Sequence, residues 1–197
     1  MLQHSLLPKH HIERIDRPEG RQYKLPSGLL VPSVTNVIGS YFKKDLSGWI
    51  ARVGEAKAEA IKNQAAVKGT ALHKITERYV LNDPAYKQGS MPFILELFAG
   101  IKPHIDEHVD MIYGVEHPLW SNKLMTAGTT DLLCRWDGRP SVVDIKGSIN
   151  IKKEEWIENY FVQAATYGIM ARSMYEDIDF LDIVIIMAVD HEKPIIY

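Results

Sequence analysis

Cysteine is nearly absent from this sequence, which has one, Cys134, among 197 residues. A single cysteine excludes a disulfide within the chain. It also excludes any zinc site or iron–sulfur cluster that several cysteine ligands would hold, so we expect no iron–sulfur cluster. Such a composition fits a reducing compartment, and we expect a cytoplasmic location.

The sequence also lacks an excess of basic residues and any long apolar run. Its formal net charge is −2 and its pI is about 6.4. A protein that binds nucleic acid by overall charge is basic, so binding here would need locally concentrated positive charge, or metal ions that neutralise acidic groups. No segment is apolar for long enough to span a bilayer, and the N-terminus lacks a hydrophobic signal segment, so we expect no membrane contact.

Internal repeats, low-complexity tracts and linkers are missing as well. With 197 residues, of which 46% are hydrophobic, the chain is expected to form one globular domain over 1–197. We divide it into an N-terminal part (1–45), a helical part (46–111) and a part with a sheet and a helix (112–197).

In the N-terminal part, Pro26-Ser27-Gly28 is a turn signal between two strand-like runs, 22–25 and 29–31, which predicts a small hairpin. Ser33 can cap a short helix that runs to Gly39.

In the helical part, the pattern predicts one helical segment over 46–81, with room for a break, and another over 92–111. Pro103 indicates a kink or a break in the second helix, because proline lacks the amide hydrogen that a helix interior needs.

The third part begins with three short runs rich in β-branched and aromatic residues, which predict a strand meander over 112–120, 125–136 and 141–146. An amphipathic helix is expected over 154–175, followed by a buried strand over 182–189 and a short one over 195–197. The helix is expected to pack through one stripe, namely Trp156, Tyr160, Gln163, Tyr167, Met170 and Met174. This order of elements predicts an α/β fold with a mixed sheet between helices.

Two charged residues, Asp144 and Lys146, share one face of the strand predicted over 141–146. Side chains alternate along a strand, so Val143 and Ile145 should point into the opposite layer. Carboxylates bind divalent metal and an ammonium group can steady a nucleophile or a phosphate, which suits phosphodiester cleavage. The Ile145 carbonyl lies between them and can be a further ligand. Alone, D-x-K is common by chance and also fits a surface ion pair.

Asp131 and Glu116 are candidate ligands on the two preceding strands. Asp131 follows G-T-T and lies among apolar residues, where a lone carboxylate is costly to bury unless a metal compensates it. It also fits a capping or turn aspartate. Glu116 can join a metal cluster or hold its water, and it equally fits an edge-strand glutamate in solvent.

Two helical pairs with i, i+4 spacing complete the candidate set. His73 and Glu77 share a helix face, and neutral imidazole is a good metal ligand, although the spacing alone favours a surface polar pair. Gln163 and Tyr167 share a face of the last helix, with Tyr160 three residues earlier. These groups can contact phosphates or stacked bases, but periodicity alone favours a core stripe.

The order of these motifs, G-T-x-x-H, G-T-T-D, D-I-K and Q-x-x-x-Y, resembles the PD-(D/E)XK nuclease superfamily in its RecB- and Cas4-like exonuclease branch. Within that branch, P-S-V-T at 32–35, G-T-A-L-H at 69–73 and N-Y-F-V-Q at 159–163 are most similar to the phage and mitochondrial genome maintenance exonucleases. The resemblance covers about 30–197. It implies a restriction-endonuclease-like core and an exonuclease for single-stranded DNA ends, serving DNA replication, recombination or repair in a bacterial or phage-infected cell.

The resemblance also implies roles for individual residues. The ligands of Mg²⁺ or Mn²⁺ would be His73, Asp131, Asp144 and the Ile145 carbonyl. Lys146 would be the catalytic lysine, which orients the attacking water or offsets charge in the transition state.

Further roles are implied around that centre. Glu77 and Glu116 would be auxiliary acids at the metal site. Members of the group often have Thr-Ser after the lysine; here Gly147-Ser148 follows, which leaves Ser148 as a phosphate donor. Substrate would be contacted from the last helix by Gln163, Tyr167 and Tyr160.

Two other interpretations stay open. The chain could be a non-catalytic nucleic-acid-binding module that keeps the nuclease fold, although its complete acid–lysine set favours an enzyme. His104 and His108 could bind zinc, although a solvated acidic helix face explains them and no fourth ligand is evident. The lysines that could line a DNA path are Lys43, Lys44, Lys68, Lys74, Lys152 and Lys153.

Overall fold

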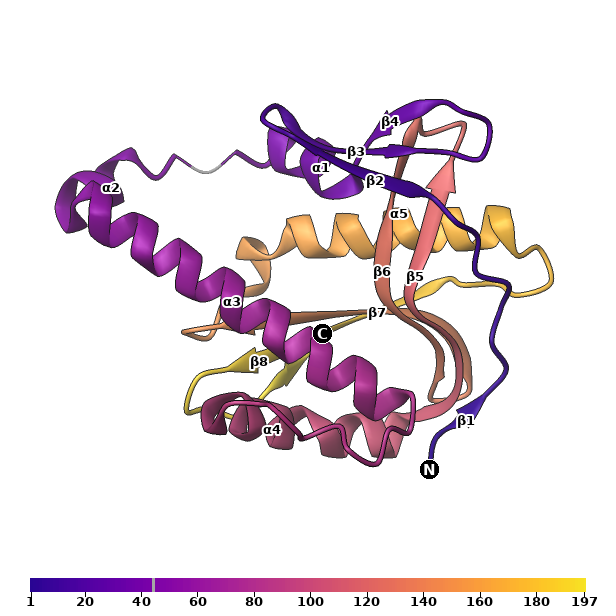
Figure 1. Cartoon of the computed structure of the whole chain (residues 1–197). Coiled ribbons are helices and arrows are strands. Elements are labelled where there is room, and N and C mark those ends of the chain that lie inside the picture. Colours follow the sequence, from indigo (N-terminus) through magenta and orange to yellow (C-terminus); the bar gives the residue numbers. More distant parts are fainter. Residues whose placement is uncertain (44) are drawn as a thin grey trace.

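The structure is a computed structural model that describes residues 1–43 and 45–197 (Figure 1). Lys44 lies outside the described residues. The strands found in them are β1 (Gln3–His4), β2 (Glu13–Arg17), β3 (Gly20–Lys24), β4 (Leu30–Pro32), β5 (Val109–Ser121), β6 (Thr126–Trp136), β7 (Arg139–Ser148), β8 (Asp182–Val189) and β9 (Ile195–Ile196). The helices found in them are α1 (Val34–Tyr41), α2 (Ser47–Val53), α3 (Glu55–Val80), α4 (Pro92–His108), the 3-10 helix η1 (Glu154–Trp156) and α5 (Glu158–Met174).

The main sheet has the strand order β1-β5-β6-β7-β8-β9. Strands β5, β6 and β7 form the predicted antiparallel meander. Strand β8 lies parallel to β7, β1 lies parallel to β5, and β9 is antiparallel to β8. The predicted α/β fold with a mixed sheet between helices is therefore confirmed.

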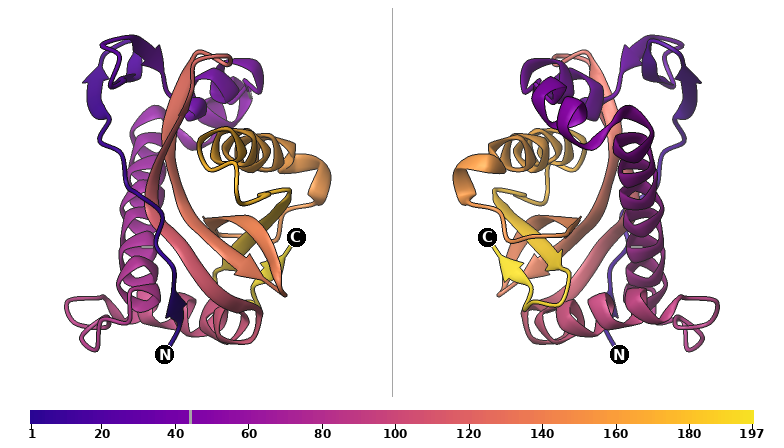
Figure 2. Two further views of the ribbon diagram at one scale, coloured as in Figure 1. Left: turned by 90° about the vertical axis from the view of Figure 1, so that its right-hand side faces the viewer. Right: turned by 90° about the vertical axis from the view of Figure 1, so that its left-hand side faces the viewer.

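Helices cover both faces of this sheet and create two cores (Figure 2). Helices α3 and α4 pack on one face, where Val143 and Ile145 are buried. Helices α5 and α1 pack on the other face, where Val142 and Leu133 are buried. Side chains therefore alternate along β7 as predicted: Val143 and Ile145 point into the α3 and α4 layer, and Val142 points into the opposite one.

A small antiparallel sheet of β2, β3 and β4 lies beyond one end of the main sheet (Figure 1). Strands β3 and β4 are the predicted hairpin. Strand β2 was not predicted, because four of its five residues are charged and only Ile15 is partly buried. As predicted, Ser33 caps the next helix: its hydroxyl accepts from the amide of Asn36, although α1 extends to Tyr41.

The helical part differs from expectation in its boundaries. The predicted break lies at Gly54, whose φ of 85° favours glycine and separates α2 from α3. Helix α4 continues through Pro103, since Ile101 and Ile105 on either side are fully buried and this packing outweighs the lost backbone hydrogen bond. It ends at His108, because the following residues enter β5.

The last helix also begins later than predicted. Residues Glu154–Trp156 form η1, and the fully buried Ile157 separates it from α5. Trp156 is therefore not part of the core stripe, and about half of it is exposed. Every helix in the described part of the chain is too short or too polar to cross a bilayer.

Strands β6 and β7 stop pairing midway along their length, and the site lies where they separate. Their pairing runs from Trp136↔Arg139 to Leu132↔Val143 and goes no further. Beyond Leu132, β6 stays paired with β5 and rises toward the small sheet, which it meets through a bridge between Ala127 and Ser33 (Figure 1). Helix α3 contacts both β5 and β7 at this opening.

Candidate metal centre

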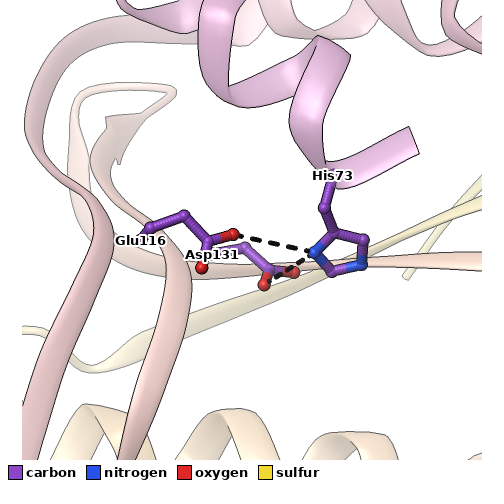
Figure 3. Close-up of side chains that lie close together, drawn as sticks. All are labelled: His73, Glu116 and Asp131. Atoms are coloured by element: carbon purple, nitrogen blue, oxygen red, sulfur yellow. Dashed lines mark ion pairs between the residues drawn. The ribbon is translucent and has the colours of Figure 1, made fainter. Parts of the chain in front are cut away.

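Three elements bring one potential metal ligand each to the opening: His73 from α3, Glu116 from β5 and Asp131 from β6 (Figure 3). Nδ1 of His73 lies 3.1 Å from Oδ1 of Asp131 and 3.9 Å from Oε1 of Glu116. One ligand atom from each residue lies within 4.8 Å of the others. Within the described residues, this is the one group of three or more His, Cys, Asp or Glu side chains that is close enough to share an ion.

The local backbone explains why the two carboxylates meet. Strand β5 pairs with β6 at Val115↔Leu132 and at His117↔Thr130, so Glu116 and Asp131 lie opposite each other on adjacent strands. Glu116 has a φ of 42°, which is rare for a residue other than glycine, and β5 has a register irregularity just before it. Strain of this kind persists where the surroundings enforce it, which is typical of functional sites.

The acidic partners control the protonation of His73. Burial lowers the pKa of its imidazole, but hydrogen bonds to Asp131 and Glu116 outweigh burial and raise the pKa to about 10. Burial in turn raises the pKa of Asp131, whereas the His73 hydrogen bond and charge hold it below its usual value. A protonated imidazole therefore faces two carboxylates through Nδ1, and the same two carboxylates suit a bound cation (Figure 3).

A second group lies on the α5 side of β7. Nζ of Lys146 donates to Oδ1 of Asp144 at 2.9 Å, and the side-chain amide of Gln163 donates to the same oxygen at 3.1 Å. Nζ of Lys146 also lies 5.2 Å from the ring centre of Tyr160. Asp144 and Lys146 do share a face, as alternation along the strand predicted.

Asp144 is almost completely buried, with 2% of its surface exposed. Burial raises the pKa of its carboxyl group to about 6, even though the charge of Lys146 opposes this. Burial lowers the pKa of Lys146, but the charges of Asp144 and Asp131 outweigh that and keep it above its usual value. Oδ2 of Asp144 lies 2.9 Å from Nζ of Lys146, yet it is buried and accepts no hydrogen bond from the described residues.

Asp131 joins the two groups. Its Oδ2 accepts a hydrogen bond of 2.7 Å from the backbone amide of Ile145, which lies between Asp144 and Lys146 in β7. The side chain thus takes the place that a backbone acceptor of β6 would fill if the strands were still paired. The negative charge of Asp131 also contributes to the raised pKa of Asp144. The two predicted aspartates therefore belong to one site.

The three-ligand cluster lies in a cleft of about 1080 Å³ between α3, strands β5 and β6, α5 and the N-terminal segment. We call it the polar cleft. Its lining includes the predicted residues Glu77, Lys74, Gln163 and Tyr167 as well as Lys146. Glu77 thus lies near the centre but outside the three-ligand cluster.

The cleft also contains basic residues that the sequence analysis missed, namely Lys9, Arg14 and Arg21. Arg14 and Arg21 both pair with the exposed Asp16 on β2. They were not predicted, because acidic and basic side chains are mixed along residues 1–21. Only the antiparallel pairing of β2 with β3 brings Arg14 and Arg21 to the same side of the cleft.

Other predicted residues lie elsewhere. Ser148 donates its hydroxyl hydrogen to the Asn150 carbonyl and lines a different cleft. Lys68 forms an ion pair with Asp190, and Lys152 donates to the hydroxyl of Tyr160 at 2.7 Å. These contacts leave both lysines less available for phosphate than expected.

The remaining predicted lysines and the zinc interpretation have weaker support. Lys43 is exposed, and Lys153 lies 3.9 Å from Glu155. His104 and His108 stack on each other with ring centres 6.2 Å apart, and His108 pairs with Asp137. In the described residues these histidines do not form a group of three ligands, so a zinc site there is not supported.

Comparison with protein-family models gives no match for this chain, and comparison with curated proteins gives none either.

Proposed function

We propose that this chain is a divalent-metal-dependent nuclease that hydrolyses phosphodiester bonds at single-stranded DNA ends in the cytoplasm. The observation that carries the proposal is the hydrogen bond between Asp131 and the Ile145 amide. It unites a cluster of three metal-ligating side chains with a buried aspartate–lysine pair. The motif order that resembles the PD-(D/E)XK nucleases supports the same reaction.

The donor set fits Mg²⁺ or Mn²⁺. Two carboxylates and an imidazole from His73, Glu116 and Asp131 are suitable ligands. The buried Oδ2 of Asp144 offers a further oxygen, which lies 2.9 Å from Nζ of Lys146 and accepts no hydrogen bond from the described residues. When bound, the ion would polarise the scissile phosphate and lower the pKa of a water molecule. Glu116 extends the ligand set expected from the sequence, in which it was an auxiliary acid.

The protein groups around the centre would handle charge. Lys146 brings a positive charge that can offset the negative charge developing on the phosphate. Asp144 holds the ammonium group of Lys146, and the Gln163 amide holds Asp144. Gln163 therefore acts through Asp144 in this proposal, rather than only by contacting substrate.

The polar cleft supports a polyanionic substrate. The chain as a whole has a net charge of −2, so any attraction for nucleic acid must be local. Lys9, Arg14, Arg21, Lys74 and Lys146 line the cleft, whose acidic lining residues are Glu77, Glu116 and Asp131. Arg14 and Arg21 pair with Asp16, so Lys9 and Lys74 are the basic residues there that form no ion pair among the described residues. Phosphates bound along this side of the cleft would pass close to Lys146.

The test is digestion of end-labelled single-stranded DNA with Mg²⁺ or Mn²⁺. We expect the parent protein to release nucleotides and Asp144→Asn to lose this activity, while circular DNA of the same sequence stays intact. Equal cleavage by the parent and Asp144→Asn would contradict the proposal. Binding of DNA without cleavage at any metal concentration would instead favour the non-catalytic binding module.

A further inference from the structure

A second cleft of about 720 Å³ lies on the other side of α3 from the polar cleft. It is bounded by α3, α4, η1 and the segment 147–152, and we call it the apolar cleft. Large apolar side chains line it and are substantially exposed, namely Phe93, Ile149, Ile151 and Trp156. Its volume is in the range of about 300–1,000 Å³ that is usual for small-molecule sites.

The apolar cleft adjoins the candidate metal centre. Gly147 and Ser148 line it and directly follow Lys146, which lines the polar cleft. Ile149 is three residues beyond Lys146, so their Cα atoms are at most about 11 Å apart. Between the clefts, the Lys68 side chain passes over Gly147, where an added Cβ would meet its Cε at 3.5 Å. Since Lys146 points to the α5 side of β7, a nucleotide with its phosphate at Lys146 would place its base in this cleft by passing the Lys68 side chain.

The charged residues that line the apolar cleft are two lysines and two acids, Lys68, Lys152, Glu96 and Asp190, so their formal charges balance. Lys68 pairs with Asp190. The polar cleft differs in being lined by five Lys or Arg residues and three acids, although two of its arginines pair with Asp16. A neutral, apolar cleft suits a nucleobase, whereas the charged one suits the sugar–phosphate backbone.

We propose that the apolar cleft binds one unpaired nucleobase, that of the nucleotide adjacent to the phosphate at Lys146. The inference rests on the proposed nuclease function and makes its substrate class narrower. Ile149, Ile151 and Trp156 contact the base faces, and Gln64 and Asn150, which also line the cleft, carry side-chain amides that can hydrogen-bond base edges. A paired base in a duplex does not present its faces, so this cleft selects single-stranded nucleic acid.

The test is equilibrium binding of a labelled single-stranded oligonucleotide, without divalent metal so that no cleavage occurs. A single abasic site is moved along the oligonucleotide in a series. We expect one abasic position to weaken binding by the parent about 10-fold, the order expected for one stacked base. An abasic site at that position should weaken binding by Ile149→Ser much less, because this variant has already lost the contact between Ile149 and the base.

Ile169→Ser is the matched control. Ile149 and Ile169 are exposed to similar extents, 58% and 54%, but Ile169 lies on α5 outside the cleft. It should show the same abasic penalty as the parent. If no abasic position weakens binding, or if Ile149→Ser keeps the full penalty, the cleft does not bind a base. If the parent is a dimer and Ile149→Ser a monomer, the cleft is an interface between copies and the proposal is overturned.

The outcomes separate this inference from the proposed function. A parent that digests single-stranded DNA but shows no abasic effect remains a nuclease without a base-binding cleft. A parent that neither binds nor digests single-stranded DNA overturns both.

Discussion

The two halves of β6 have different surroundings. From Leu132 to Trp136 the strand pairs with both β5 and β7, and its apolar side chains are buried. From Thr126 to Asp131 it pairs with β5 but not with β7, and several of its residues line the polar cleft. One half stabilises the fold and the other opens the site.

The difference shows how the site is oriented. Where β7 leaves β6, the backbone amide of Ile145 needs a new acceptor, since buried amide groups are rarely left unpaired. The carboxylate of Asp131 supplies it, and its other oxygen faces His73. The separation of two strands thus holds a metal-ligating side chain in a fixed position.

The largest effect is expected at Lys146, in the open half of the sheet. Lys146→Met should lower the cleavage rate at least about 100-fold, the order seen when one charge-stabilising donor is removed. Lys152→Met is the matched control, because Lys152 lies 5.0 Å from the same Tyr160 ring but is not paired with Asp144. The measurement is the single-turnover rate on end-labelled DNA. Equal losses in both variants would show that Lys146 has no special role.

A pair of substitutions at Asp131 tests the role of its carboxylate as an acceptor. Both Asp131→Asn and Asp131→Ala remove the charge, but only the asparagine can still accept from the Ile145 amide. The alanine variant should therefore be less stable than the asparagine variant by about 1–3 kcal/mol, the cost of an unsatisfied buried donor. Urea denaturation measures the free energy of unfolding. Equal stabilities would mean that β7 does not depend on this bond.

Sequence reasoning predicted the paired half of the sheet well, because alternation and turn signals act locally. It placed Val143 and Ile145 in one layer and Asp144 with Lys146 in the other. It also identified Asp131, His73 and Glu116 as separate candidates. It could not show that Glu116 lies opposite Asp131, or that Asp144 lies outside the three-ligand cluster, because both depend on where the strands separate.

The basic residues of the N-terminal segment were missed for a similar reason. Arg14 and Arg21 belong to strands whose charged residues hide any apolar pattern, and the cleft forms only when the small sheet meets β6. Pro103 illustrates the opposite case: a local rule predicted a kink or a break, and α4 nevertheless continues unbroken through Pro103, where Ile101 and Ile105 are buried.

Substitution of each of two glutamates in the polar cleft tests which of them binds the metal ion. Glu116→Gln should weaken Mn²⁺ binding at least about 10-fold. Glu77→Gln should change it little, because Glu77 lies outside the three-ligand cluster. The shift of the thermal midpoint with Mn²⁺ concentration measures both, since a ligand of the folded state stabilises it. The reverse result would transfer the ligand role to Glu77.

Cys134 lies in the half of β6 that pairs with both β5 and β7, and its thiol tests whether this half is sealed from solvent. Burial, with a smaller effect from the charge of Asp110, raises the pKa of its thiol. Above about pH 8.5 the unfolded chain loses this proton while the folded protein keeps it, so stability falls as the pH rises. Relative to Cys134→Ala, the parent should lose about 1.4 kcal/mol per pH unit above that value. Denaturation between pH 7 and pH 10 measures this, and parallel curves would show that the thiol is not sealed from solvent.

The smallest expected effect lies at Ser33, where the open half of β6 meets the small sheet. Its hydroxyl caps α1, and its backbone pairs with Ala127. Ser33→Ala removes the cap and the 3.0 Å hydrogen bond to the Thr35 hydroxyl, and should cost about 1 kcal/mol of unfolding free energy. Ser40→Ala is the control, because the Ser40 hydroxyl is exposed and bonds a carbonyl within α1. If the two variants were equally stable, the backbone bridge to β6 and the buried core would hold α1 without the help of its cap.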